Sequence, residues 1–275
     1  ALDLGRLAAD TRSLPARRAA ALTFEWPLML LAFLGSLGLL TGCAAATVVS
    51  PSWALAMSRR FGLGPKVHVV TNGYDPEELA DVKPHEFRHF AIVYAGSFYP
   101  PKRVISPVMA ALRRLKETTP GKKGEWHFHY YGEEQNHVRE AAERFNVTQR
   151  IVLHGGVPRS EALSAVRGAD VAVVIASVGA DSAIEDAGWI PAKIFETMGL
   201  RTPTLLVAPP RSDITTIVDA TGAGRGFLAS DMEGMAIFIG NAMQGLVPRP
   251  KTVEAYAWTN IAKRFDAILR QAVTG

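Results

Sequence analysis

The sequence predicts an α/β fold in which a parallel sheet carries helices on both of its faces. Two features of the pattern support this. Apolar runs typical of strands alternate with amphipathic helical patterns, at the spacing of βαβ units. Some of these runs, such as VAVVIA at 171–176, are apolar throughout, which indicates burial on both faces. With 275 residues, of which 48% are hydrophobic and 20% charged, the chain can bury a full core.

The N-terminal part contains an anomaly. Residues 1–20 are rich in Arg and Ala and have helical character, but residues 26–58 contain no charged side chain. Residues 27–49 are long enough to span a bilayer. Alternatively, the run ending at Leu40-Thr-Gly-Cys43 imitates a lipoprotein cleavage site. A third interpretation is a buried helix through about residue 42, followed by a core strand over 46–50.

Glycine and proline residues favour the third of these interpretations, while the other two stay open. Gly35, Gly38, Gly42 and Pro51 interrupt the uncharged run, which favours buried elements over a membrane span. We therefore expect residues 26–49 to belong to a globular fold.

The rest of the chain is regular. Strands are expected at 67–70, 91–95, 126–131, 151–154, 171–176, 204–207 and 226–229. Helices are expected near 104–117, 137–145, 159–167, 193–199, 212–220 and 232–244. A last helix places an apolar stripe on one face, formed by Trp258, Ile261, Phe265, Ile268 and Leu269. The turn at 71–75 and the polar linker at 81–88 precede the main run of alternating elements.

Composition limits the classes of ligand. The net charge of +4 and the isoelectric point of about 9.3 fit small anionic ligands or an anionic membrane surface. This excess is too small to indicate nucleic-acid binding. A single cysteine, Cys43, excludes an internal disulfide and a multi-cysteine metal site. The sequence also lacks a Walker loop, a Gly-x-Gly-x-x-Gly motif and a clustered metal-ligand motif, so no cofactor or metal is expected.

The stretch WIPAKIFETMGLRTPTLL, residues 189–206, organises the predicted site. Pro191 suits the first turn of a helix, whose apolar side chains would point inward. Gly199 could end this helix in the left-handed conformation, and Pro203 prevents it from resuming.

Two polar side chains of this helix lie near its N-terminus. A helix N-terminus beside a sheet, with Lys193 in its first turn, suits a phosphate group. Glu196 could accept hydrogen bonds from the hydroxyls of a ribose. From these residues alone, an ordinary amphipathic helix with a surface Lys and Glu remains an equal alternative.

This stretch resembles the donor-site signature of the retaining "glycosyl transferases group 1" family, which has the GT-B fold. The family form is P-x-K-x-x-E, followed by a small residue and Pro. Five residues match it: Pro191, Lys193, Glu196, Gly199 and Pro203. The fuller pattern has an acidic residue eight positions before the last Glu, where this chain has Gly188, with Glu185 and Asp186 just upstream.

Further matches follow the strands, where ligands of such sheets bind. Gly96 could let backbone approach a ligand, and Lys102 matches a family lysine that contacts a diphosphate. The family's arginine after this glycine is Ser97 here, so this phosphate contact is either absent or replaced by Arg103. Lys102, Arg103 and Lys193 are the cations available to a metal-independent enzyme.

Two turns complete the resemblance. Gly132 begins a turn similar to the family's G-x-G, and His154-Gly155-Gly156-Val157-Pro158 is similar to its h-G-x-v turn beside the nucleobase. The resemblance therefore implies a donor contact at Gly132, although the second glycine of that turn is missing, and base contacts near His154, Gly155 and Val157. A strand-end histidine such as His154 is by itself a poor candidate for catalysis.

The resemblance implies a Rossmann-like donor-binding domain at 72–250, a partial acceptor-side segment at 1–71 and a returning C-terminal helix at 251–275. It also implies retaining sugar transfer from a nucleotide-diphosphate sugar to a hydroxyl of a glycan or lipid-linked acceptor, in synthesis of a polysaccharide, glycolipid or cell-envelope glycan. Such an enzyme would be bacterial and cytoplasmic, with peripheral contact at the inner membrane left open.

Other functions also remain open. A noncatalytic nucleotide-sugar binding module and a membrane-anchored assembly subunit are the main alternatives. An epimerase of similar architecture is a third, against which the P-x-K-x-x-E helix argues.

Overall fold

The computed structural model describes residues 42–118, 125–179 and 184–274. Its centre is a six-stranded sheet with the strand order β5-β4-β3-β6-β7-β8. Every neighbouring pair in this sheet is parallel. The strands are β3 (Phe90–Ala95), β4 (Trp126–Tyr131), β5 (Ile151–Gly155), β6 (Val171–Ile175), β7 (Thr204–Val207) and β8 (Gly224–Phe227). The predicted α/β class is therefore confirmed.

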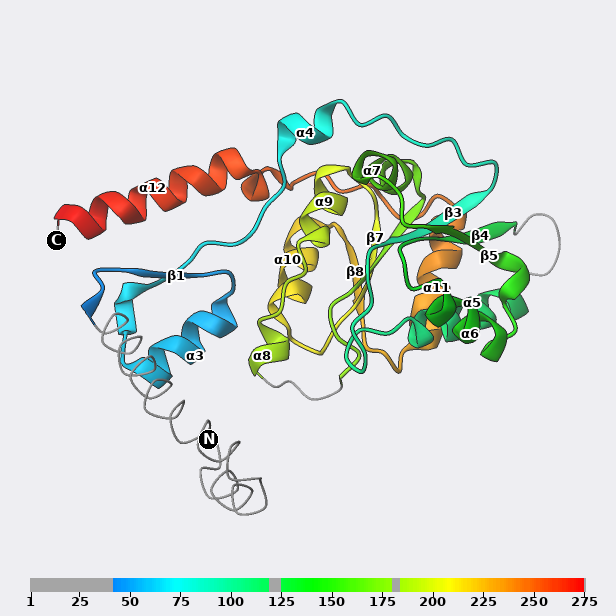
Figure 1. The fold of residues 1–275 in the computed structure, drawn as a ribbon, viewed down its shortest axis with the longest axis horizontal. Coiled ribbons are helices and arrows are strands. Elements are labelled where there is room, and N and C mark those ends of the chain that lie inside the picture. Colours follow the sequence, from blue (N-terminus) through cyan, green and yellow to red (C-terminus); the bar gives the residue numbers. More distant parts are fainter. Residues whose placement is uncertain (1–41, 119–124, 180–183, 275) are drawn as a thin grey trace, which may run out of the picture.

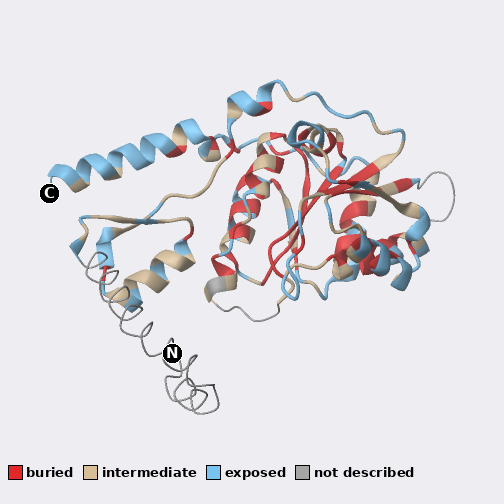
Figure 2. Cartoon of the chain, viewed as in Figure 1, coloured by how far each residue is buried: buried red, intermediate tan, exposed pale blue. Residues whose placement is uncertain are grey.

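Helices cover both faces of this sheet (Figure 1). One face carries α5 (Ser106–Thr118), α6 (Gln135–Arg144) and α11 (Met232–Met243), whose apolar side chains join one core cluster. The other face carries α7 (Arg159–Gly168), α9 (Lys193–Gly199) and α10 (Asp213–Thr221), which join a second cluster. Figure 2 shows the buried residues concentrated in the sheet and on the helix faces that cover it.

Side-chain alternation in β6 explains why both faces are buried. Val171, Val173 and Ile175 belong to the first core cluster, and Ala172 and Val174 belong to the second. Successive side chains of a strand point to opposite faces, so an apolar side chain at every position suits a sheet that is covered twice.

A small unit precedes the main sheet. It consists of β1 (Ala46–Val48), α3 (Pro51–Phe61), the 3-10 helix η2 (Gly64–Lys66) and β2 (Val67–Val69). β1 and β2 pair in parallel. The strand expected near 46–50 exists, although its three residues are intermediate or exposed rather than buried in a core. Most of the uncharged run before it lies outside the described residues. Among the helices of the described part, none has the length and apolar character needed to cross a membrane.

The small unit contacts the main domain through α3. The backbone N–H and hydroxyl of Ser52 donate to the Asp213 carboxylate at 2.8 and 3.0 Å. The Trp53 and Trp189 rings meet edge to face, with centroids 6.0 Å apart. Trp189 follows the short helix α8 (Ile184–Ala187). These contacts place the small unit beside the loop that precedes α9.

Connecting segments lie before and after the main sheet. The segment before it contains α4 (Pro76–Ala80), which Asp75 caps by accepting from the N–H groups of Glu77 and Glu78. The 3-10 helix η4 (Thr148–Arg150) precedes β5, and η5 (Glu254–Tyr256) precedes the last helix, α12 (Trp258–Thr274). α12 extends away from the sheet (Figure 1). Of its predicted apolar stripe, Ile261 is buried, whereas Trp258, Phe265 and Leu269 are exposed.

The end of α9 differs from the prediction. The helix does end at Gly199, but the residue in the left-handed region is Arg201, with a φ of 60°. Gly199 serves packing instead, because a Cβ at this position would collide with Tyr74 and Leu79. The predicted left-handed cap at Gly199 was therefore wrong. The inward positions of Ile194, Phe195 and Met198 are confirmed, since all three side chains are fully buried.

Candidate functional site

A cavity of about 620 Å³ opens at the carboxyl end of the sheet. Loops after β3, β4 and β5 form its walls, together with the first turns of α7 and α9. Most predicted site residues line it: Gly96, Ser97, Arg103, Gly132, Val157, Pro191, Lys193 and Glu196. Lys102, His154 and Gly155 are not among the lining residues. The expected convergence of loops from separate strands is therefore present in the structure.

Lys193 is a partly buried cation that reaches across to β3. Its Nζ donates to the Ala95 carbonyl at 3.1 Å and to the Tyr94 hydroxyl at 3.4 Å. Gly96, with a φ of 128°, permits this approach, because a Cβ there would collide with the Lys193 ammonium. Burial, followed by repulsion from Arg103, lowers the pKa of Lys193 to about 8. No carboxylate of the described residues forms an ion pair with this ammonium, so it can receive an anion.

Arg103 supplies a second cation at the cavity wall. Its guanidinium carbon lies 4.4 Å from the Tyr99 ring centroid and 4.6 Å from that of Trp189. The backbone of Arg103 exchanges two hydrogen bonds of 3.0 Å with Tyr99, which fixes the loop after β3. Stacking between two rings orients a guanidinium while leaving its N–H groups available. Within the described part of the chain, Arg103 has no carboxylate partner, so it is suited to a phosphate group.

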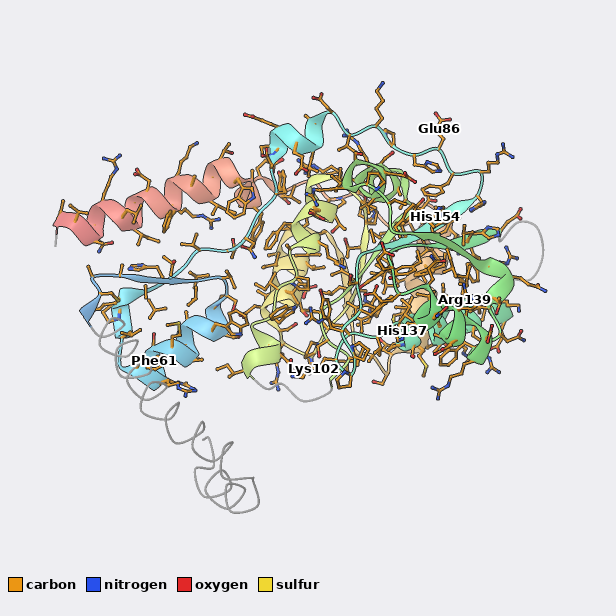
Figure 3. The ribbon with its side chains drawn as sticks, in the orientation of Figure 1. Phe61, Glu86, Lys102, His137, Arg139 and His154 are labelled. Carbon is orange, nitrogen blue, oxygen red and sulfur yellow. The ribbon has the colours of Figure 1, made fainter. Side chains whose placement is uncertain are left out.

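Lys102 lies elsewhere. Its Nζ donates to both carboxylate oxygens of Asp186 at 2.8 Å, and its side chain is 57% exposed. Figure 3 shows Lys102 at the margin of the domain next to α8, well away from His154. The structure thus brings together Lys193 and Arg103 as cavity cations, and it does not place Lys102 in the wall.

Glu196 lies one turn after Lys193 and faces the same cavity. One of its carboxylate oxygens accepts a hydrogen bond of 2.7 Å from Nη1 of Arg159. Because Lys193 and Glu196 are three positions apart, they share one side of α9. The structure therefore places the predicted phosphate and ribose contacts side by side.

The turn after β5 presents backbone rather than a side chain. The N–H of Gly132 donates to the Gly155 carbonyl at 2.8 Å, and Gly156 and Val157 line the cavity. The His154 ring instead stacks on Tyr131, with centroids 4.0 Å apart and 3° between the planes. This end of the cavity is bordered by the main chain of the turn and by the Glu133 carboxylate, which lies against Gly156, while His154 packs on the cavity residue Tyr131.

Several wall residues were given no role by sequence reasoning, although Gly156 and Trp189 lie within stretches that it singled out. They are Tyr94, Tyr99, Gly156, Arg159 and Trp189. Tyr99 and Trp189 had no motif of their own, because stacking on an arginine depends on contacts that no local pattern encodes. Arg159 directly follows the turn at 154–158, so its position in the sequence could have identified it as a candidate wall residue.

Titratable residues also gather outside the cavity. His129 bonds His89 at 2.9 Å between their Nε2 atoms, and its Nδ1 lies 3.0 Å from Nε2 of His154. These nitrogens bond in a chain instead of converging on one point. Among the described residues, no group of three or more His, Cys, Asp or Glu side chains is placed to hold a metal ion.

The sequence comparison assigns the chain to a family. The model of the family described as "Glycosyl transferases group 1" matches residues 89–244, which contain the strands and loops that form the cavity. The match covers more than half of the chain, and the chain belongs to this family. No curated protein sequence matches the chain.

Solved structures agree with this fold. The lipopolysaccharide outer core galactosyltransferase WaaB is 16% identical, with a TM-score of 0.59 over 82% of this chain and 61% of that chain. The pneumococcal O-GlcNAc transferase GtfA, solved with UDP and GlcNAc, is 15% identical, with a TM-score of 0.60 over 83% and 45%. A glycosyltransferase from Rickettsia africae is 13% identical, with a TM-score of 0.60 over 85% and 64%. This chain therefore spans less than two thirds of the length of these three structures.

Proposed function

We propose that this chain binds a nucleotide-diphosphate sugar in the cavity and forms the donor side of a retaining glycosyltransferase. The main observation is a pair of cations in the cavity wall, Lys193 and Arg103, which have no carboxylate partner among the described residues. The cavity lies in the part of the chain that matches the glycosyltransferase family. A diphosphate carries the opposite charge and would occupy the space between them. Glu196 would hold the ribose, and the backbone near Gly156 would contact the base.

The proposed chemistry needs no metal. As the glycosidic bond breaks, negative charge grows on the departing diphosphate. Fixed cations aimed at that charge stabilise the transition state more than the bound donor. Arg103 is held by its two aromatic neighbours and Lys193 by the Ala95 carbonyl, so neither group has to reorganise during transfer.

The biological setting is part of the same proposal. Solved structures of similar fold include a lipopolysaccharide outer core galactosyltransferase and a mutant of S. aureus TarM, in complex with Fondaparinux, alpha-GlcNAc-glycerol and UDP. They support a glycan or lipid-linked acceptor and a role in polysaccharide or cell-envelope glycan synthesis. As part of this proposal we place the protein in the bacterial cytoplasm.

A thermal-shift screen tests donor binding. UDP-, GDP-, ADP- and dTDP-sugars are added to the purified chain at rising concentration, with and without a chelator. A ligand at 100 times its Kd stabilises the folded state by about 2.7 kcal/mol, so one base should raise the melting temperature clearly. No shift with any of the donors would refute the proposal, and a shift abolished by the chelator would refute its metal-free form.

A substitution at Glu196 gives a second test. Glu196→Gln should weaken nucleotide-sugar binding about tenfold or more, because a hydrogen bond to a charged group contributes about 1.5–3 kcal/mol. The melting temperature should hardly change, since the Glu196 side chain is 27% exposed and its ion pair with Arg159 lies at the surface. Isothermal titration of the donor found in the screen measures the effect. Equal affinities of the two proteins would remove Glu196 from the site.

A noncatalytic binding module is the second candidate, and one observation favours it. Gly188 stands where the family pattern has an acidic residue, and a Cβ at this position would collide with the Trp53 indole. A module of this kind would bind the donor without transferring its sugar. Transfer of radiolabelled sugar to a lipid-extractable acceptor by the full-length protein distinguishes an enzyme from such a module.

A further inference from the structure

Arg159 joins two acidic side chains from different parts of the fold. It lies in the first turn of α7, directly after the turn that follows β5. Its Nη1 donates to Oε1 of Glu196 at 2.7 Å, while Nε and Nη2 donate to the two carboxylate oxygens of Glu78 at 2.9 and 3.1 Å. The fork-to-fork pair with Glu78 fixes the plane of the guanidinium. The third contact therefore acts on Glu196 from a fixed position.

The network also separates two cavities. A second cavity of about 300 Å³ lies beside the first and is lined by the turn at 72–75, by Glu78 and by Trp258. Arg159 and Glu196 line both cavities and so stand in the wall between them. The hydrogen bond between these two side chains therefore lies in this shared wall, where Glu196 borders the first cavity.

The position of Glu78 is itself fixed. α4, which carries it, belongs to the linker between the small N-terminal unit and the main sheet. Arg167, at the other end of α7, donates to the carbonyls of Leu79 and Val82 at 2.8 and 2.6 Å. Arg159 and Arg167, at the two ends of α7, both bond to α4 and the residues just after it. Glu78 can therefore serve as an anchor for Arg159.

Energetics favour a role in orientation over a role in stability. The side chains of Arg159 and Glu78 are 55% and 43% exposed, and that of Glu196 is 27% exposed. Exposed ion pairs of this kind contribute little to the free energy of unfolding. The hydrogen bonds that Arg159 donates to Glu78 and Glu196 raise its pKa, so this side chain stays charged. What the network does fix is the direction in which the Glu196 carboxylate points.

We infer that Arg159 is a positioning residue, anchored by Glu78, that orients the Glu196 carboxylate to accept hydrogen bonds from the cis-diol of a ribose. Oε1 accepts the hydrogen bond from Arg159, and among the described residues no hydrogen bond occupies Oε2, which is available to a ligand. This inference rests on the proposed function, in which Glu196 holds the nucleotide ribose. It adds that recognition of the ribose depends on a side chain that does not itself need to touch the sugar.

The test compares ribonucleotides with analogues that lack the diol. UDP, GDP and ADP are titrated calorimetrically against the chain, each beside its 2′,3′-dideoxy counterpart. The wild type should bind the ribose form of one nucleotide about tenfold or more tightly than the dideoxy form. In Arg159→Met this ratio should fall to within about threefold, while the Kd of the dideoxy form changes little, because only the oriented hydrogen bonds are lost.

Three further variants sharpen the result. Arg159→Lys keeps the charge without the fork and should retain part of the ratio. Glu78→Gln leaves the first cavity unaltered but removes the anchor, so its ratio should fall between those of the wild type and Arg159→Met. Arg113→Met removes an exposed arginine that pairs with Glu117 on α5 and should leave every affinity unchanged.

The possible outcomes separate the two proposals. If the wild type binds none of the nucleotides, the proposed function is refuted, and this inference with it. If the wild type binds a nucleotide, the inference alone is overturned by any of three results: no preference for the ribose form, an unchanged ratio in Arg159→Met, or equal weakening of both forms in that variant.

Discussion

Under the proposed function, Lys193→Ala should reduce the turnover of sugar transfer by a factor of roughly 10²–10³, while it weakens donor binding much less. Removing one preorganised donor that faces a developing negative charge costs about 3–4 kcal/mol of transition-state stabilisation. Arg103→Ala should behave similarly, because its guanidinium lies in the same cavity wall and is close enough to lower the pKa of Lys193. Release of the nucleotide diphosphate measures turnover, and calorimetric titration measures donor affinity.

Lys102 provides the matched comparison. The sequence pattern gives it the same role, but in the structure its ammonium is neutralised by Asp186. The loss of turnover in Lys102→Ala should therefore be smaller than in the two cavity variants. Full activity of Lys193→Ala would contradict the mechanism, and an equal loss in all three variants would mean that Lys102 leaves Asp186 when the donor binds.

The pH dependence of binding supplies an independent check on Lys193. Its pKa of about 8 means that the free protein loses this charge within an accessible pH range. Above pH 8 the affinity for a nucleotide diphosphate should fall by up to about tenfold per pH unit, since the neutral amine does not attract the anion. Lys193→Met should lack this fall. Parallel pH profiles of the two proteins would show that Lys193 does not contact the diphosphate.

The sequence predicted the sheet closely, for a physical reason. A strand buried on both faces must be apolar throughout, and such runs are visible in a single sequence. β4 and β7 were predicted to the residue, at 126–131 and 204–207. β8 was predicted two residues late, because its observed start at Gly224 offers no apolar signal. Gly224 is needed there, since a Cβ would collide with the Thr204 backbone.

The cavity was predicted less completely, because its wall depends on contacts between distant residues. The P-x-K-x-x-E pattern located Lys193 and Glu196, which are fixed by one short helix. It could not show that Lys102 pairs with Asp186, 84 positions away, while the adjacent Arg103 stacks between Tyr99 and Trp189. Neighbours in the sequence take opposite roles here, and only the tertiary structure distinguishes them.

Acidification from pH 7.5 to 5.0 should destabilise the protein, with His129 as the main cause. The His129 side chain is 5% exposed, and both of its ring nitrogens bond other histidines, His89 and His154. Burial, followed by repulsion from His154 and the other nearby histidines, lowers the pKa of His129 to about 3. In the unfolded chain the pKa of a histidine is about 6.5.

The sign of the effect follows from this difference in pKa. Between pH 6.5 and 3 the unfolded chain binds a proton that folded His129 does not, so acid favours unfolding. The stabilisation is complete above pH 6.5 and is lost progressively below it. One such group lowers the free energy of unfolding by about 1.4 kcal/mol per pH unit, or about 2 kcal/mol between pH 6.5 and 5.0. His127 and His154 also have lowered pKa values and should add to this loss.

Urea unfolding at the two pH values measures the effect, and two variants isolate its source. His129→Gln retains a hydrogen-bond donor and acceptor, but it changes a buried side chain and should be less stable than the wild type at pH 7.5. Because glutamine cannot be protonated, the variant should lose about 2 kcal/mol less of its free energy of unfolding on acidification. His68→Gln changes a histidine on β2, outside the cluster, and should follow the wild type. If His129→Gln and the wild type lost the same free energy between the two pH values, His129 would be protonated in the folded state, and burial would not control its charge.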